Sequence, residues 1–167
     1  STIFVYSSKD IINLSAIKLH IILNKKCKNN YMKIFDTFMF YDEETLLDIR
    51  LNTLNQYVDY FVLVESKYFH NGKKRELKFD IEKYSKFRDK IIYIKHEQPN
   101  GKLEKLNPDD DEISKSNKLI VNAHIRENDQ RNEIFKGLKI ADQDDLILIS
   151  DVDEIPNLDG VDLKNIK

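Results

Sequence analysis

The stretch "YFVLVES", residues 60–66, sets the expected fold of this chain. It holds five consecutive apolar residues without the polar alternation of a half-exposed strand. Such a run predicts a strand that is covered on both faces, as the strands of parallel sheets are. The run ends in a carboxylate, Glu65. Because ligands of parallel sheets collect beyond the carboxyl ends of the strands, Glu65 is also a first indication of a site.

The segments before this strand fit the same fold. "KIFDTFMFY" at 33–41 predicts an aromatic-rich strand. Asp42 follows it as the expected N-cap of a helix, with two glutamates in the first turn, where the helix dipole favours them. Arg50 flanks an apolar stripe at helical spacing, which consists of Leu47, Leu51, Leu54 and Val58.

The segments after it continue the alternation of helices and strands. The Asn-Gly pair in "FHNGKK", residues 69–74, predicts a turn. A surface helix is expected at 81–90, and "IIYIK" at 91–95 predicts a third strand. Residues 97–118 hold two prolines and an acidic run, which favours a solvated loop over a calcium site because the EF-hand spacing is absent.

One more helix and strand complete the pattern. The range 122–141 predicts a helix with Arg131 on its apolar face, where a cation either extends to the surface or faces an anion in a site. "LILI" at 146–149 predicts a buried strand. Strands and helices that alternate with short links predict an α/β layer fold with a mainly parallel sheet flanked by helices.

Two aspartates follow that last strand in "SDVDEIP", residues 150–156. In an extended segment residues i and i+2 point to the same side, so Asp151 and Asp153 can face one ion while Val152 turns inward. Hard oxygen ligands on one side of Mg²⁺ or Mn²⁺ leave coordination positions free for substrate phosphates. Two other interpretations remain open: one aspartate is a nucleophile, or both form the solvated end of a strand.

Composition excludes several classes of function. The 167 residues are 41% hydrophobic, which is enough for one core, and 34% charged with a net charge of only -2. This balance argues against nucleic-acid binding and against a membrane surface as partner. Cys27 is the single cysteine, so no internal disulfide forms and a reducing, cytoplasmic location is the simpler expectation.

The two ends of the chain suggest a fragment. The chain begins at Ser1, its first methionine is Met32, and it ends a few residues after the aspartates. We therefore expect a poorly ordered leader of unknown role at 1–31 and the N-terminal part of a domain, truncated at its C-terminus, at 32–167. Within the leader, 11–23 is shorter than the ~20 apolar residues of a membrane span and holds a lysine and a histidine, so no transmembrane segment is expected.

Several motifs together resemble glycosyltransferase family 17, whose best-known members are β-1,4-mannosyl-glycoprotein β-1,4-N-acetylglucosaminyltransferases. The resemblance runs from about Met32 to Pro156 and keeps the order of the family's motifs. It is carried by four stretches: "DEETLLDIRLNTL" at 42–54, "VDYFVLVES" at 58–66, "RENDQRNEIFKGL" at 126–138 and "SDVDEIP" at 150–156.

The resemblance implies an enzyme with a GT-A-like (Rossmann-like) α/β fold. It also implies a UDP-sugar donor, with N-acetylglucosamine as the sugar, and a glycan hydroxyl as acceptor. Transfer would invert the anomeric carbon in one in-line displacement. A divalent cation, Mn²⁺ or Mg²⁺, would be held by Asp151 and Asp153 and would neutralise charge on the departing diphosphate.

The resemblance assigns further roles to single residues. Glu65 would contact the uridine or ribose, or else it only caps its strand. Arg131 would reach the diphosphate, or else it pairs with Glu127 one turn earlier. Glu43 would border the donor pocket, although electrostatics at a helix start also explain it. Glu154 would complete the second shell of the metal.

The catalytic base is not assigned. It is expected as an aspartate or glutamate beyond Lys167. His70, His96 and His124 show no partner spacing and are expected at the surface.

Two alternatives to a transferase are kept. In a phosphatase of the haloacid dehalogenase type, Asp151 would be the nucleophile and Asp153 the acid/base. The chain would otherwise be a non-catalytic fragment that binds a nucleotide sugar. A Golgi location applies instead of the cytoplasm if the protein is a eukaryotic secretory form.

Overall fold

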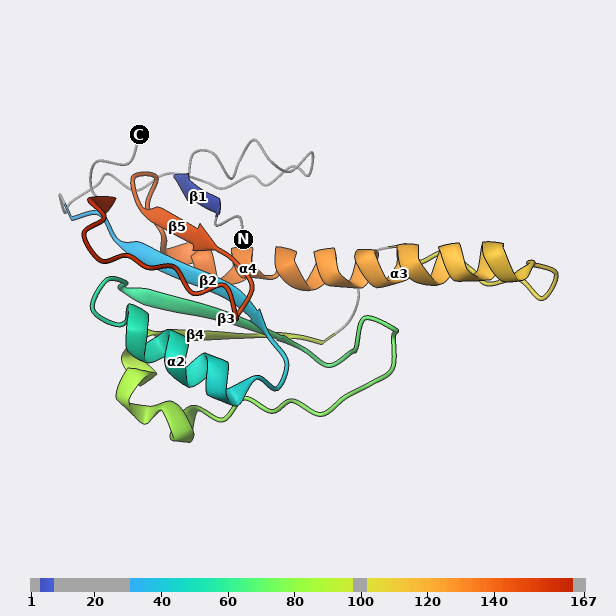
Figure 1. The fold of residues 1–167 in the computed structure, drawn as a ribbon, viewed down its shortest axis with the longest axis horizontal. Coiled ribbons are helices and arrows are strands. Elements are labelled where there is room, and N and C mark those ends of the chain that lie inside the picture. The colour runs from blue at the N-terminus through green and yellow to red at the C-terminus, as the bar shows by residue number, and fades with distance from the viewer. Residues whose placement is uncertain (1–3, 8–30, 98–101, 164–167) are drawn as a thin grey trace.

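A computed structural model describes residues 4–7, 31–97 and 102–163, and their core is a five-stranded sheet (Figure 1). The order across the sheet is β1-β5-β2-β3-β4. The four strands from β5 to β4 run parallel, and β1 pairs antiparallel with β5. Their bounds are Phe4–Ser7 (β1), Ile34–Phe40 (β2), Tyr60–Ser66 (β3), Ile91–His96 (β4) and Leu146–Ile149 (β5).

The predicted α/β fold with a mainly parallel sheet is confirmed. Each of the four parallel strands lies where its apolar run predicted it, within a residue at either end. The strand patterns did not indicate β1, which lies within residues 1–31. The apolar segment 11–23 lies outside the described residues.

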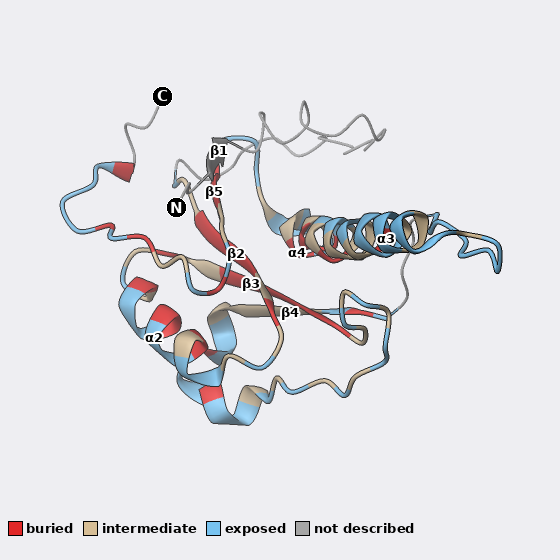
Figure 2. Cartoon of the chain, turned by 45° about the vertical axis from the view of Figure 1, so that its right-hand side comes forward, coloured by how far each residue is buried: buried red, intermediate tan, exposed pale blue. Residues whose placement is uncertain are grey.

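One face of the sheet is covered by the helix α2, Glu44–Leu54, and the 3-10 helix η1, Ile81–Lys90 (Figure 2). The predicted stripe of α2 is buried in this layer together with Phe38, Phe61 and Leu63. The predicted N-cap was one residue early, because Glu43 and not Asp42 occupies that position. The Glu43 carboxylate instead accepts hydrogen bonds from the backbone N–H groups of Tyr41 and Asp42.

The opposite face is covered by α3, Glu112–Asn132, with the short helices α4, Ile134–Gly137, and η2, Leu138–Ile140. Ile134 packs there against Phe35, Val62 and Ile147. Two covered faces explain why β3 is apolar at successive positions instead of alternate ones.

Helix α3 begins ten residues before the predicted start at 122, so the loop predicted for 97–118 was wrong over its last part. The side chain of Asp111 caps it by accepting from the backbone N–H of Ser114 at 2.7 Å. The amide of Asn122 exchanges two hydrogen bonds with the backbone of Glu104, which holds the preceding segment along the helix. This half of α3 extends beyond the sheet (Figure 1) and leaves Ile113 74% exposed, so it lacks an apolar stripe that sequence periodicity can detect.

The first turn of α3 is expected to loosen in acid. The N–H of Ser114 holds the pKa of Asp111 below its ordinary value of 3.8. A carboxyl group with a lowered folded pKa stabilises the fold above its unfolded pKa, and that contribution is lost as the pH falls through the folded value. Amide exchange of residues 112–115, followed by NMR, should therefore gain an extra acceleration below about pH 4.

The matched control for this expectation is Asp111→Asn. Asparagine caps a helix about as well as aspartate but does not titrate. The extra acceleration should be absent in the variant. Equal acceleration in both proteins would show that the Asp111 cap is not the acid-sensitive element.

Within the described ranges, no helix is both long enough and apolar enough to cross a membrane.

Candidate active site

A cavity of about 370 Å³ lies at the carboxyl ends of β2 and β5. These strands are neighbours in the sheet, but β2 leads into α2 on one face while β5 follows α3 and α4 on the other. This is the topological switch point at which α/β sheets bind their ligands. The cavity is lined by Met39, Tyr41, Glu43, Leu46, His70, Glu127, Asp151, Val152 and Asp153.

Four of those nine residues are carboxylates that come from three separate segments. Asp151 and Asp153 follow β5, Glu43 precedes α2, and Glu127 lies on α3. The fold thus brings three residues that were selected from the sequence, Asp151, Asp153 and Glu43, to one cavity. Glu127 had been considered only as an ion-pair partner.

Arg131 lies beside this group. Its Nη2 is 3.1 Å from Oε1 of Glu127 and 3.4 Å from Oδ1 of Asp151. The pair with Glu127 considered from the sequence therefore forms, and the same guanidinium also contacts a proposed metal ligand. The Arg131 side chain is 41% exposed, so these contacts lie near solvent and hold it weakly.

The aspartates lie in a turn and not in the extended segment assumed from the sequence. Strand β5 ends at Ile149, and the backbone N–H of Glu154 donates to the carbonyl of Asp151 at 3.0 Å. Val152 is buried in the cluster between the sheet and α2, as expected, while the Asp151 side chain is 57% exposed. The Glu154 carboxylate accepts from the N–H of Asp151 at 3.4 Å, so it lies directly behind the pair.

The donor set of the turn fits a hard cation that is shared with a ligand. Asp151 and Asp153 both line the cavity, and their side chains carry carboxylate oxygens, the ligands that hard cations prefer. In the described part of the chain, no group of three or more His, Cys, Asp or Glu side chains is arranged to hold a metal ion. Magnesium-like ions are commonly bound by one or two carboxylates, with water and substrate phosphates as the other ligands.

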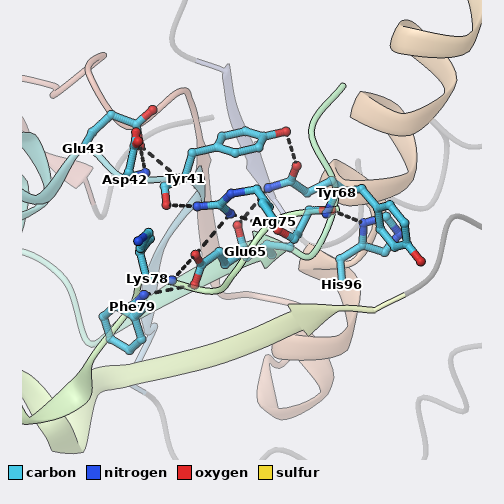
Figure 3. Close-up of polar contacts among 12 residues, drawn as sticks. Tyr41, Asp42, Glu43, Glu65, Tyr68, Arg75, Lys78, Phe79 and His96 are labelled. Atoms are coloured by element: carbon cyan, nitrogen blue, oxygen red, sulfur yellow. Dashed lines mark hydrogen bonds and ion pairs between the residues drawn. The ribbon is translucent and has the colours of Figure 1, made fainter. Parts of the chain in front are cut away.

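Glu65 is not among the residues that line the cavity. Its carboxylate is fully buried and accepts hydrogen bonds from the backbone N–H groups of Lys78 at 2.6 Å and Phe79 at 3.1 Å (Figure 3). It also accepts from the Tyr93 hydroxyl at 2.7 Å and lies 3.1 Å from Arg75. Burial and the Glu65 bond together raise the pKa of Tyr93. N–H and O–H groups of the protein thus occupy the carboxylate oxygens of Glu65, which would otherwise accept hydrogen bonds from a bound nucleoside.

Arg75 is a half-buried residue, with a side chain that is 5% exposed, and no sequence pattern indicated it. Its guanidinium donates to the backbone carbonyls of Ser66, at the end of β3, and Tyr41, just after β2, and its charge centre lies 5.0 Å from the Tyr41 ring (Figure 3). It therefore joins the ends of two parallel strands beside the cavity. Its position in the charged run at 73–78 is typical of a surface residue, which is why the pattern concealed it.

Tyr41 connects the cavity to α3. Its hydroxyl donates to Oε1 of Gln130 at 2.7 Å, and the Gln130 amide donates to the carbonyl of Val64. Burial raises the pKa of Tyr41, so its hydroxyl stays a proton donor at ordinary pH. The ring of His70 packs edge-on against Tyr41, with 5.1 Å between the ring centroids.

The surface expectation for the histidines was wrong for His96, which is 2% exposed and lies 3.1 Å from the Ser66 hydroxyl through Nδ1. His70 lines the cavity, and its carbonyl accepts from Arg126 of α3 at 2.9 Å. The predicted turn around it is confirmed, with Gly72 at a φ of +85°. His124 is exposed, as expected.

Arg50 lies beneath the aspartate turn and is fully buried. Nε and Nη2 donate to the two carboxylate oxygens of Asp36 at 2.8 and 2.7 Å. Nη2 also donates to the Ser150 hydroxyl at 2.6 Å. Nη1 contacts three backbone carbonyls of the turn, those of Asp151 at 2.6 Å, Val152 at 3.2 Å and Glu154 at 3.3 Å.

Comparison with known proteins identifies the family. A model of glycosyltransferase family 17 matches residues 1–166, so the match extends on both sides of the 32–156 range over which the motifs carried the resemblance. No curated protein and no solved structure matches the chain. The match lends no support to the phosphatase alternative, and it implies a sugar donor and an acceptor as substrates. With nearly every residue covered and an α/β fold that suits such an enzyme, the chain belongs to glycosyltransferase family 17.

Proposed function

We propose that the chain binds a UDP-sugar in the cavity between β2 and β5 and transfers the sugar, N-acetylglucosamine, to a glycan hydroxyl with inversion. We further propose that donor binding depends on a divalent cation, Mn²⁺ or Mg²⁺, held by Asp151 and Asp153. The observation that carries the proposal is the concentration of four carboxylates around a cavity at the switch point of the sheet.

The charge of the cavity supports the dependence on a cation. Among the described residues, four carboxylates line the cavity, and neither a lysine nor an arginine does. A diphosphate entering beside Glu43, Glu127, Asp151 and Asp153 would be repelled, because like charges a few ångströms apart disfavour each other strongly in a partly buried site. Asp151 and Asp153 would hold a cation that offsets this repulsion and would supply Lewis-acid stabilisation of the leaving group.

The remaining roles follow from the contacts of the chain. Arg131 is proposed to leave Asp151 and donate to the diphosphate, a change that costs little because its present ion pairs are solvent-exposed. Glu43 borders the donor, fixed in place by the N–H groups of Tyr41 and Asp42. Glu154 orients the turn from behind. We propose the cytoplasm as the location.

The reaction itself is one displacement. The acceptor oxygen forms a bond to the anomeric carbon while the bond from that carbon to the diphosphate oxygen breaks, and UDP leaves with the electron pair. The proton of the acceptor hydroxyl passes to a base, for which we propose an aspartate or glutamate carboxylate.

Calorimetric titration of the chain with UDP, in Mn²⁺ and in a metal-free buffer with chelator, tests the donor site. The wild-type chain should bind UDP with Mn²⁺ and show no binding without it. The double variant Asp151→Ala/Asp153→Ala should lose the Mn²⁺-dependent heat. Equal UDP affinity with and without Mn²⁺, or unchanged affinity in the double variant, would refute the proposal.

A second aspartate pair in the chain provides the matched control. Asp142 and Asp144 have the same spacing but precede β5, at the opposite end of the strand from the cavity. Asp142→Ala/Asp144→Ala makes the same change in charge and should leave UDP affinity unchanged. Competition of UDP-N-acetylglucosamine against UDP-glucose and UDP-galactose then tests the sugar, and equal affinities would contradict the choice of N-acetylglucosamine.

A further inference from the structure

The five N–H donors of Arg50 are all directed at two targets. One is the Asp36 carboxylate on β2, and the other is the turn from Ser150 to Glu154. An arginine has five such donors in a rigid plane. Nε and one donor of Nη2 serve Asp36, the second donor of Nη2 serves Ser150, and Nη1 serves the turn carbonyls.

Stability alone does not explain an ion pair at this position. Burying two charges costs several kcal/mol of desolvation, and apolar residues of similar volume often replace such pairs without loss of stability. The surroundings would suit an apolar residue, since the Arg50 charge centre lies 4.6 Å from the centre of the Phe38 ring and α2 packs its leucines alongside. What an apolar residue cannot supply is a set of directed donors for carbonyl groups.

Those donors determine which side of the turn faces the cavity. The carbonyls of Asp151, Val152 and Glu154 all point to Nη1, and the Val152 side chain is buried on the same side. With these groups directed inward, the carboxylates of Asp151 and Asp153 take no part in the contacts with Arg50, and both residues line the cavity. The hydroxyl of Ser150 adds to this by accepting from Arg50 and donating to the carbonyl of Glu154 at 3.1 Å.

The negative charge of Asp36 allows Arg50 to hold the turn from below without repelling a cation bound above it. A lone guanidinium under the turn would repel a divalent cation held above it. Paired with Asp36, Arg50 is part of a neutral unit that contacts the backbone of the turn and does not use the carboxylates of Asp151 and Asp153. Arg131, by contrast, pairs directly with the Asp151 carboxylate.

We propose that Arg50, with Asp36 and Ser150, is a positioning residue that holds the turn at 150–154 so that Asp151 and Asp153 face the cavity before a cation and donor arrive. The inference rests on the proposed function of that pair. Residues behind metal ligands typically change metal affinity by about 10- to 100-fold when they are replaced.

Two measurements on Arg50→Lys, Ser150→Ala and the wild type test the inference. The first is amide hydrogen exchange of residues 150–155 in metal-free protein. The second is the Mn²⁺-dependent affinity for UDP by calorimetry, with Mn²⁺ binding followed separately by electron paramagnetic resonance. Lysine keeps the charge, but its three N–H donors lie on a single nitrogen, whereas those of arginine are spread over a planar guanidinium. A lysine therefore cannot donate to Asp36 and to the turn together.

Asp145→Asn is the control for a purely structural effect. Asp145 is buried at the other end of β5, where it accepts from the backbone N–H of Lys33 at 2.8 Å and pairs with the Lys33 ammonium. This variant should lower stability without changing exchange at 150–155 or the affinity for UDP with Mn²⁺.

The expected result for Arg50→Lys is faster exchange confined to the turn and UDP affinity with Mn²⁺ weakened by about 10- to 100-fold. Ser150→Ala should show the same pattern more weakly, and it decides the test if Arg50→Lys does not fold. Unchanged exchange and affinity in the folded variants would overturn the positioning role. If the wild type itself binds no UDP with Mn²⁺, the proposed function fails. If the wild type binds UDP with Mn²⁺ and the folded variants match it in affinity and in exchange, only the positioning role of Arg50 is refuted.

Discussion

Replacing Arg50 with methionine is expected to lower the free energy of unfolding by about 3–5 kcal/mol, the usual cost of removing one partner from a buried ion pair. The reason is the carboxylate that remains. Asp36 has no exposed surface, and among the described residues Arg50 supplies its charge partner and a hydrogen bond to each of its carboxylate oxygens. Urea denaturation followed by circular dichroism measures the change, with the denaturation slope checked for constancy.

A double variant separates the cost of the unpaired charge from the role of the turn. Arg50→Met/Asp36→Val removes both charges, so much of the lost stability should return. The turn carbonyls would still lack their donor, so fast exchange at 150–155 should persist in the double variant. A single variant as stable as the wild type would show that the Asp36 carboxylate does not depend on Arg50.

Replacing Glu65 with glutamine should also destabilise the fold by about 3–5 kcal/mol, because Arg75 would be left buried without its counter-charge. Lys78 and Phe79 donate to different oxygens of Glu65, so a glutamine would also direct its amide NH₂ group at one of these two N–H donors and leave that donor without an acceptor. Because the carboxylate is occupied by the protein, UDP affinity in the folded variant should equal that of the wild type. Thermal unfolding and calorimetry at a temperature well below the transition measure the two effects.

Glu76→Gln is the matched control for this change. Glu76 is exposed and follows Arg75 directly in the chain, and exposed substitutions of this kind usually change stability by less than about 0.5 kcal/mol. A folded Glu65→Gln protein with weakened UDP binding would return Glu65 to the donor site, as the family resemblance implied. Equal stability of the two variants would mean that the Glu65 contacts contribute little.

The parts of the fold that followed from sequence are those with a local pattern. The apolar run of 60–66 predicted β3, and the leucines of α2 predicted its buried face, because periodicity records which side of an element is covered. The strand-end position of Asp151 and Asp153 also followed from the pattern, and the structure places both residues at a cavity; their role as metal ligands stays a prediction.

The parts that did not follow depend on partners distant in sequence. Arg50 was visible only as a charge beside an apolar stripe, because its acceptors in the turn lie 100 to 104 residues later. Glu65 was correctly placed at a strand end, but its donors come from 75–79 and from Tyr93, which no pattern linked to it. The first half of α3 was missed because its exposed surface leaves no amphipathic signal, and only the Asp111 cap marked its start.

The position of β2 between β3 and β5 has a consequence for how the chain reaches its native state. Its pairing with β3 closes a short loop, while its pairing with β5 joins segments such as Lys33 and Asp145, which are 112 residues apart. Closing the longer loop costs more entropy, so we expect β5 to join β2 after β3 does and β2 to be an edge strand until then. Asp36 places a charge on the inward side of that edge, a device that discourages pairing with a strand of another molecule. The buried ion pair beneath the cavity would then also protect the growing sheet from aggregation until β5 arrives.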